Sequence, residues 1–200
     1  MKFYTLNGPA PLCTNSYLLI TEAGHAVIID PAASLSAYGN ILKEEKATLT
    51  HIFCTHGHFD HVGEAENLRR AWGAKLYCEP ADLKGEWLYP LVSSDCGYAE
   101  GQPIAVDELT FTVWHTPGHT PGSVCILCCD RLFTGDTLFA GGVGRTDMDG
   151  GSFTQLVDSC QKLKNLPIPE NTQVLTGHGE PSFYGHEMKY NNFITDMCQD

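Results

Sequence analysis

The segment that decides the fold of this chain is Thr55-His56-Gly57-His58-Phe59-Asp60-His61. Three histidines and one aspartate in it offer four potential metal ligands within six residues. The apolar run Ile52-Phe53-Cys54 precedes it and predicts a short buried strand. The ligands therefore lie on a turn at the C-terminal end of a strand, where the clefts of α/β folds open. This pattern indicates a metal site rather than a polar surface loop.

A helix is predicted after this turn, because apolar residues recur on one face before Gly73, which is placed to end it. Those apolar residues are Val62, Ala65, Leu68 and Trp72. Alternating positions on the turn cannot all face one ion without strain, so we expect two ions close together. His56 and His58 bind the first ion in this scheme. Asp60 and His61 bind the second.

Three later residues complete the predicted ligand set. His119 lies in the turn Thr116–Gly122, whose prolines and glycines make it rigid, as a metal ligand requires. Asp136 and His178 each follow a predicted strand, although Asp136 alone also fits an ordinary residue at a strand end. The assembled set has His56, His58 and His119 on the first ion, Asp60, His61 and His178 on the second, and Asp136 bridging them.

Histidine and carboxylate ligands suit zinc, iron or manganese better than calcium or magnesium. We expect two divalent ions, with zinc as the first choice and iron or manganese as alternatives. Two such ions about 3.5–4 Å apart can hold a bridging hydroxide that acts as the nucleophile. Asp60 is the predicted catalytic residue, because its carboxylate can orient this hydroxide and accept a proton.

The composition describes a globular chain of 200 residues, with 42% hydrophobic and 18% charged residues. Its net charge of −12 disfavours nucleic-acid and anionic membrane partners, so a small-molecule substrate is expected. No apolar run is long enough for a membrane span, and no secretory signal is recognisable. Nine cysteines, an odd number, favour free thiols in a reducing cytoplasm. The oligomeric state is left open.

The rest of the chain repeats one order twice, with strands first and helices after. Strands are predicted at 16–20, 26–29, 74–78, 109–115, 123–129, 131–134 and 173–176, and further helices at 34–46, after the Ser152 cap and at 183–196. The helix after Ser152 is expected to bury Phe153, Leu156, Val157, Cys160 and Leu163. This order suggests a sandwich in which both halves bring ligands to one sheet edge.

Several residues allow two interpretations. Asp30 either supports the metal site from behind or caps a turn. Arg145 either binds a substrate carboxylate or pairs with Asp147. The long segment 79–103 is typical of a lid, and its aromatic residues Trp87, Tyr89 and Tyr98 either line a pocket or pack under it.

The sequence also contains a Cys125-x-x-Cys128 motif inside a predicted strand. Residues three apart on a strand face opposite ways, so we expect core cysteines rather than a redox or zinc motif. The remaining histidines are expected to be structural or on the surface: His25, His51, His115 and His186.

The ligand turn, together with His119, Asp136 and His178, resembles the metallo-β-lactamase superfamily. The segments Thr116–Gly122, Gly135–Phe139 and Gly144–Asp147 are similar to its glyoxalase II-like branch, the hydroxyacylglutathione hydrolases, and in particular to short bacterial members. The resemblance implies an α+β fold, a four-layer αββα sandwich with mixed sheets. It also implies two metals and hydrolysis of a thioester such as an S-2-hydroxyacylglutathione.

Longer glyoxalase II enzymes carry a C-terminal helical region that supplies glutathione-binding residues. Here 200 − 178 = 22 residues follow the last ligand. We therefore expect residues 1–200 to form a single domain without a separate glutathione-binding helical domain. The thiol part of the substrate is then either glutathione or another thiol.

Persulfide dioxygenases of the same superfamily are the main alternative. They bind one iron through the positions that match His56, His119 and Asp136, and they share the Gly-Arg-Thr-Asp segment. The full ligand set, with His178 between two glycines, favours the hydrolase. A β-lactamase is disfavoured, because a cysteine typically takes the place of Asp136 there. A nuclease is disfavoured by the negative charge, and a non-catalytic metal-binding module is the remaining class.

Overall fold

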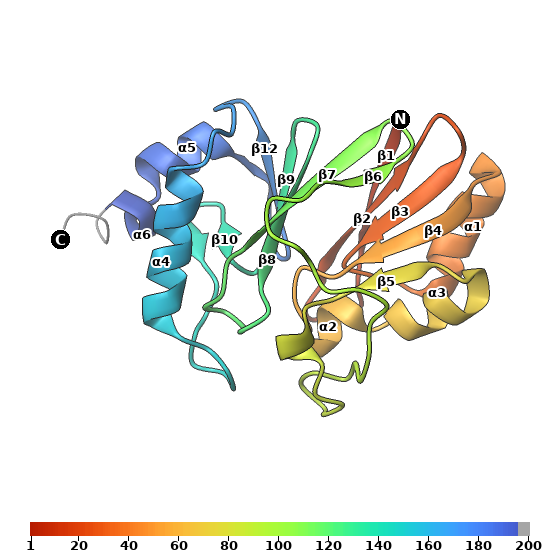
Figure 1. Cartoon of the computed structure of the whole chain (residues 1–200), viewed down its shortest axis with the longest axis horizontal. Helices are drawn as coiled ribbons and strands as arrows, with labels where there is room; N and C mark the ends of the chain where they lie inside the picture. Colours follow the sequence, from red (N-terminus) through yellow and green to blue (C-terminus); the bar gives the residue numbers. More distant parts are fainter. Residues whose placement is uncertain (196–200) are drawn as a thin grey trace.

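The computed structural model of the protein describes residues 1–195. Two β-sheets face each other in it, and helices cover the outer face of each sheet (Figure 1). This αββα order of layers confirms the predicted α+β fold class. The first sheet and its helices come from the N-terminal half of the chain, and the second sheet and its helices come from the C-terminal half.

The first sheet has the strand order β1-β2-β3-β4-β5. Its strands are β1 (Lys2–Asn7), β2 (Asn15–Ile20), β3 (His25–Ile29), β4 (Thr48–Phe53) and β5 (Lys75–Tyr77). Strands β1, β2 and β3 pair antiparallel, which confirms the predicted hairpin of β2 and β3. Strands β3, β4 and β5 pair parallel, so the sheet is mixed.

The second sheet has the order β13-β12-β9-β8-β7-β6 and is also mixed, since only β9 and β12 run parallel. Its strands are β6 (Ile104–Val106), β7 (Leu109–His115), β8 (Val124–Cys128), β9 (Arg131–Gly135), β12 (Gln173–Thr176) and β13 (Ser182–Phe183). A separate short pair joins β10 (Leu138–Phe139) to β11 (Gly142–Val143).

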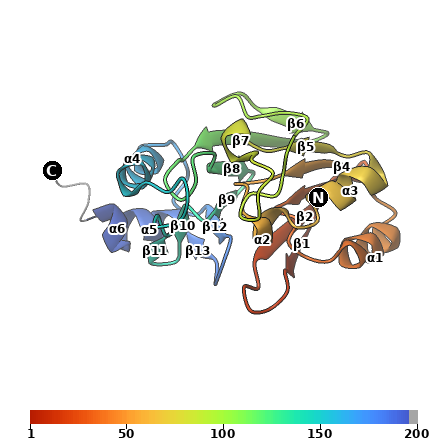
Figure 2. The same ribbon diagram turned by 90° about the horizontal axis from the view of Figure 1, so that it is seen from below.

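The helices lie on the two outer faces, as Figures 1 and 2 show from two directions. The first sheet carries α1 (Leu35–Glu45), α2 (Phe59–Val62) and α3 (Ala65–Trp72), and the second carries α4 (Phe153–Lys164), α5 (Tyr184–Tyr190) and α6 (Asn192–Thr195). The helix predicted at 183–196 is thus two short helices, and its last residue lies outside the described range. No helix in the described part of the chain has both the length and the apolarity of a membrane span.

The molecule has three buried apolar cores: one between the two sheets, and one between each sheet and its helices. Side chains along a strand alternate between two of these cores, because successive side chains point to opposite faces of a sheet. On β3, Ala26 and Ile28 face the helices, whereas Val27 and Ile29 face the other sheet. On β8, Cys125 packs under the C-terminal helices and Cys128 lies between the sheets. The expected opposite orientation of these two cysteines is therefore confirmed.

Two local predictions differ from the structure. The helix after the ligand turn is divided into α2 and α3, although Gly73 ends it in the left-handed conformation as expected. Phe153, predicted to be buried, is 53% exposed. It is the first residue of α4, and the buried face of that helix begins three positions later at Leu156 and continues with Cys160 and Leu163. Val157, also predicted to be buried, is only partly buried.

Candidate metal centre

The seven predicted ligands converge at one edge of the sandwich. The ligand turn follows β4, His119 follows β7, Asp136 follows β9, and His178 follows β12. Three groups of potential ligand atoms lie within 4.8 Å of one another: His56, His58 and His119; His56, His61 and Asp136; and Asp60, His61 and His178. The first and third groups are the two half-sites predicted from the sequence.

Asp136 faces both half-sites. Its Oδ2 lies 3.5 Å from His119 Nε2 and 3.5 Å from His178 Nε2, and its Oδ1 lies 3.3 Å from His61 Nε2. Asp60 Oδ2 lies 3.3 Å from His178 Nε2. Asp136 therefore occupies the position from which a carboxylate can bridge two ions.

The donor atoms of this cluster fit metal ions. His58 Nδ1 lies 2.9 Å from His119 Nε2, with both imidazoles turned toward one point. Within residues 1–195, four buried side-chain N or O atoms lack a hydrogen-bond partner, and two of them, His56 Nε2 and Asp136 Oδ1, belong to the cluster's facing atoms. His58 Nε2 is also without a partner, but it lies on the other side of the ring from the Nδ1 that faces His119. Buried polar atoms are rarely left without a partner. Imidazole and carboxylate donors arranged in this way are ligands for divalent transition metals.

The two half-sites differ in charge. Burial lowers the pKa of His56 well below its usual value and that of His58 to about 4, so these imidazoles are neutral. Burial also acts to lower the pKa of His61, but the carboxylates of Asp136 and Asp30 raise it well above its usual value. A hydrogen bond with Asp60 raises the pKa of His178. The second half-site therefore joins imidazoles to carboxylates, whereas His56 and His58 of the first half-site are neutral imidazoles.

Asp30 supports the site from behind, one of its two predicted roles. Its carboxylate accepts hydrogen bonds from Thr55 N and Thr55 Oγ1, each at 2.7 Å, and lies 3.0 Å from His61 Nδ1. These contacts orient the His61 ring so that Nε2 faces the cluster. His119 is oriented similarly, because its Nδ1 lies 2.7 Å from the carbonyl oxygen of Arg145.

The side chain of Arg145 pairs with Asp147 through two contacts of 2.6 and 2.8 Å and is exposed. This pairing is one of the two interpretations drawn from the sequence. The other, contact with a substrate carboxylate, stays a prediction.

Sequence reasoning missed two residues of this site. Thr14 Oγ1 donates a hydrogen bond to Asp60 Oδ2 at 2.7 Å. Asp82 is fully buried behind the ligand turn. Neither has a local sequence signal, because the partners of each are separated from it by 25 or more residues.

The segment 79–103 is mostly packed rather than open. Tyr98 donates hydrogen bonds to the carbonyl oxygens of Cys54 and Tyr77 in the inter-sheet core. The ring of Tyr89 is buried and lies 4.8 Å from that of His58, whereas Trp87 is 78% exposed. Packing is thus the observed role of Tyr98, and only Tyr89 reaches a candidate ligand.

A cavity of about 570 Å³ opens beside Asp60, between the β1–β2 loop and α2. Its walls are largely apolar, and its charged lining residues are the acids Asp60 and Glu64. Phe59, on one wall, stacks on Trp87 with ring centres 4.9 Å apart. The cavity is large enough for the arm of a small-molecule substrate.

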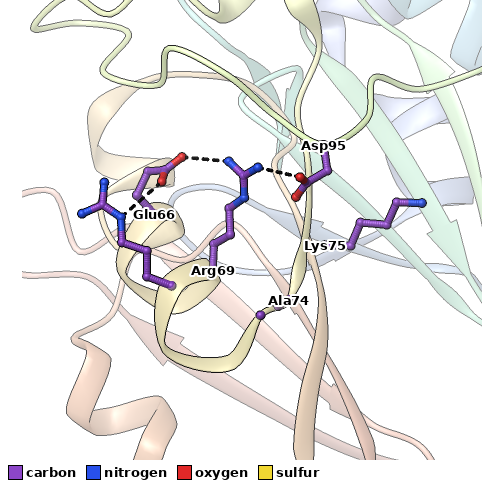
Figure 3. A pocket seen from close by; sticks show the side chains of 7 residues that line it. Glu66, Arg69, Ala74, Lys75 and Asp95 are labelled. Atoms are coloured by element: carbon purple, nitrogen blue, oxygen red, sulfur yellow. Dashed lines mark hydrogen bonds and ion pairs between the residues drawn. The ribbon is translucent and has the colours of Figure 1, made fainter.

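A second hollow, of about 540 Å³, lies between α3 and β5 and is drawn in Figure 3. Four of its charged side chains form ion pairs, since Arg69 contacts Glu66 and Asp95, and Arg70 contacts Glu66. None of the seven candidate ligands lines it.

Comparison with known proteins identifies the family. The family model described as the metallo-beta-lactamase superfamily matches residues 10–178. The chain belongs to the metallo-β-lactamase superfamily. The expectation drawn from the ligand turn is therefore confirmed at the level of the superfamily.

Two curated members of the superfamily are similar over most of their length. A probable metallo-hydrolase, YqgX of Bacillus subtilis, is 32% identical over 92% of this chain and 93% of its own. The hydroxyacylglutathione hydrolase GloC of Haemophilus influenzae is 30% identical over 90% of this chain and 92% of its own.

Three solved structures of proteins with different functional names are similar to this chain to about the same degree. BLEG-1, named a B3 metallo-β-lactamase, has 34% identity and a TM-score of 0.85 and covers 97% of this chain and 100% of its own. ETHE1 of Myxococcus xanthus has 31% identity and a TM-score of 0.84, with coverage of 100% and 91%. TTHA1623, solved in a di-iron-bound form, has 30% identity and a TM-score of 0.80, with coverage of 95% and 99%.

Proposed function

We propose that this protein is a two-metal hydrolase that cleaves thioesters of the glyoxalase II type, such as an S-2-hydroxyacylglutathione, into an acid and a thiol. The observation that carries the proposal is the second half-site. Asp60, His61 and His178 lie together beside the three-histidine group, so the chain has ligands for two ions rather than one. The similarity to GloC supports the thioester as the substrate.

Two divalent ions bound by this cluster would lower the pKa of a water molecule and polarise the thioester carbonyl. His56, His58 and His119 hold the first ion in this proposal. Asp60, His61 and His178 hold the second, and Asp136 bridges.

Asp60 has a further role in the proposed reaction. Its carboxylate is fixed by Thr14, orients the attacking water and accepts its proton, which then passes to the leaving thiolate. The acyl or thiol arm of the substrate occupies the cavity beside Asp60. Arg145 is the proposed contact for a substrate carboxylate once its pairing with Asp147 opens.

Zinc is the proposed metal, and the di-iron form of the similar protein TTHA1623 makes iron the principal alternative. A cytoplasmic enzyme with a small-molecule substrate, and without nucleic-acid or membrane partners, fits the net charge of −12 and the cysteine content. We propose that residues 1–195 form one domain.

Persulfide oxidation is the second candidate, and the similarity to ETHE1 of Myxococcus xanthus favours it. In this alternative function, His56, His119 and Asp136 would hold one iron. Asp136 Oδ2 lies 3.5 Å from His119 Nε2, so this smaller set is also assembled.

The test compares three substrates in one preparation. Metal content is measured, and hydrolysis of S-lactoylglutathione is assayed beside oxygen uptake with glutathione persulfide and hydrolysis of a β-lactam. The hydrolase proposal expects two metal equivalents and thioester turnover. His178→Ala, which removes a ligand of the second ion only, should lower that turnover by more than about 100-fold.

The competing functions give different results. One iron, oxygen uptake and an unimpaired His178→Ala variant would establish the dioxygenase instead. β-Lactam turnover alone would place the protein with the lactamases. Bound metal without turnover of any of these substrates would indicate a non-catalytic metal-binding module.

A further inference from the structure

We propose that Asp82 is a positioning residue that holds the two turns carrying His56, His58 and His119 in the geometry of the first metal site. Asp82 ends the short 3-10 helix Pro80–Asp82, at the start of the segment 79–103. It is not one of the seven candidate ligands and does not touch the reacting atoms. Its effect is exerted through the backbone on which the three histidines stand.

The carboxylate of Asp82 joins turns that are far apart in sequence. Its Oδ2 accepts a hydrogen bond from Gly57 N at 2.8 Å, and Gly57 lies between two ligands of the first turn. The same oxygen accepts a bond from Thr120 Oγ1 at 2.7 Å, and Oδ1 accepts one from Gly122 N at 2.8 Å. One side chain thus fixes the ligand turn after β4 and the ligand turn after β7 relative to each other.

Two glycines provide the space for this arrangement. A Cβ atom on Gly57 would lie 2.6 Å from Asp82 Cβ, and one on Gly122 would lie 2.7 Å from Asp82 Cγ. A Cβ atom does not approach non-bonded atoms this closely. Both turns therefore approach Asp82 as closely as glycine permits. The close fit restricts the carboxylate to one position.

The surroundings of Asp82 partly offset the cost of burying its carboxylate. The residue is fully buried, and burial raises its pKa, whereas the hydrogen bonds from Thr120, Gly57 and Gly122 and the charge of Lys84 act to lower that pKa. Hydrogen bonds reduce the cost of a buried carboxylate. A cation bound by the histidines in front of Asp82 would favour its charged form further.

Two further residues of the segment 79–103, Leu88 and Tyr89, reinforce the ligand turn after β4. Phe59 N donates a hydrogen bond to the carbonyl oxygen of Leu88 at 3.0 Å. Tyr89 packs against His58, and its hydroxyl donates to the carbonyl oxygen of Asp149 at 2.6 Å. This part of the segment therefore acts as a brace for the first metal site. The inference rests on the metal site of the proposed function but not on thioester hydrolysis.

The experiment measures metal binding rather than turnover. Ion-free protein is titrated with Co²⁺, and the visible absorption and competition with a chelator give the affinity of each binding step. Asp82→Asn keeps the shape of the side chain but removes its charge and turns an NH₂ group toward N–H donors. We expect one binding step to weaken by about 10- to 100-fold, with altered Co²⁺ absorption, and the other step to be unchanged.

Asp95→Asn is the matched control. Asp95 lies in the same segment and also accepts a backbone N–H, from Leu76, but it faces Arg69 away from the cluster. It should bind both Co²⁺ ions as the wild type does. Thr120→Val is the second test variant, because it removes one donor to Asp82 and retains the charge. It should weaken the same step by a smaller factor.

Denaturant unfolding of the ion-free variants separates positioning from general stability. A folded Asp82→Asn variant with wild-type affinities and absorption would overturn the inference. If that variant does not fold, wild-type Co²⁺ binding by Thr120→Val overturns it, and a weakened step supports it. A wild-type protein that binds no metal would contradict the proposed function as well.

Discussion

Two residues of the β1–β2 loop contact candidate ligands: Thr14 donates a hydrogen bond to Asp60, and the carbonyl oxygen of Leu12 lies 3.2 Å from His178 Nδ1. The hydroxyl of Thr14 is buried, and the bond of 2.7 Å points one oxygen of Asp60 toward the cluster. Residues that orient ligands in this way are often as important as the ligands.

Replacing Thr14 by valine removes the hydroxyl and keeps the shape. We expect Thr14→Val to lower kcat for thioester hydrolysis by about 10-fold, because Asp60 loses its fixed orientation. Thr14→Ser, which keeps the hydroxyl, should retain most of the activity. Steady-state kinetics with S-lactoylglutathione measure both, and equal rates for the valine and serine variants would contradict the role.

Protonation should affect the metal affinity of the two half-sites differently. In ion-free protein, the raised pKa values of His61 and His178 favour their protonated forms, so an ion that binds there must displace protons. The affinity of that half-site should fall as the pH is lowered from about 8 to about 6. His58, with its pKa lowered to about 4, and His56, with its pKa lowered well below its usual value, remain neutral over this range, so their binding of an ion should change little.

Calorimetric titrations with Zn²⁺ at the two pH values, each in two buffers of different ionisation enthalpy, count the released protons. Proton release confined to one binding step is the expected result. Equal release in both steps would contradict the difference between the half-sites.

The candidate ligands could be predicted from sequence because each follows an apolar strand or lies in a turn rich in glycine and proline. Asp82 could not be predicted in this way. It stands in Glu79-Pro80-Ala81-Asp82, which has the composition of a surface turn, and its partners lie 25 to 40 residues away. Asp30 had two plausible roles, because the position of His61 relative to it depends on the tertiary fold.

At the scale of the elements, helix α4 supports the turn that carries His119. Ser152 N donates to the carbonyl oxygen of Gly118 at 2.8 Å, and Ser159 Oγ donates to that of Pro117 at 2.6 Å. The N-cap of α4 is Ser152, whose Oγ accepts a hydrogen bond from Gln155 N at 3.4 Å. This confirms the predicted start of the helix.

Ser152→Ala should lower the free energy of unfolding by about 1 kcal/mol, because an N–H group of the first helical turn loses its acceptor. Metal content should not change, since the backbone contact to Gly118 remains. Urea unfolding measures the loss. Thr154→Ala, at an exposed position of the same turn, is the control, and an equal loss there would contradict the capping role.

The strands were predicted well because buried strands are apolar on both faces, as in β2 and β8. Helix faces were predicted less well. Phe153 matched the apolar period, but a residue at the first position of a helix can point past the edge of the sheet it covers. The break between α2 and α3 was also missed, because the apolar period continues across it, although Gly63 is a poor helix former.

At the scale of the whole molecule, the inter-sheet core joins the two halves that supply the ligands. Phe111 is fully buried there, with its ring centre 4.9 Å from that of Phe53. The αββα class followed from the family resemblance and from the repeated order of strands and helices. The pairing order of the strands did not, because it depends on contacts between residues far apart in the chain.

Phe111→Ala should destabilise the protein by about 3–5 kcal/mol, through lost burial and the cavity left behind. That is a large part of the stability of a typical domain. Thermal unfolding with and without metal measures it. Phe111→Leu should cost less, and a stability unchanged in the alanine variant would contradict the role of this core.

Removing the metal should abolish activity without unfolding the protein, because the three apolar cores do not include the ligands. Ions that bind only the folded state add stability, by about 2.7 kcal/mol at a hundredfold excess over Kd. We therefore expect chelator-treated protein to keep its circular dichroism and to melt at a lower temperature. Restored metal should return both activity and Tm, and a chelated protein that is unfolded would contradict this expectation.

The distance along the chain between His61 and His178, which is 117 residues, has a consequence for biosynthesis. A growing polypeptide has its first ligand turn long before the strand that brings His178 has left the ribosome. If two ions bind as proposed, the first half-site is complete only once His119 has been synthesised, and the second only once His178 has been added. Shortage of the metal would leave a folded but idle enzyme rather than a degraded fragment.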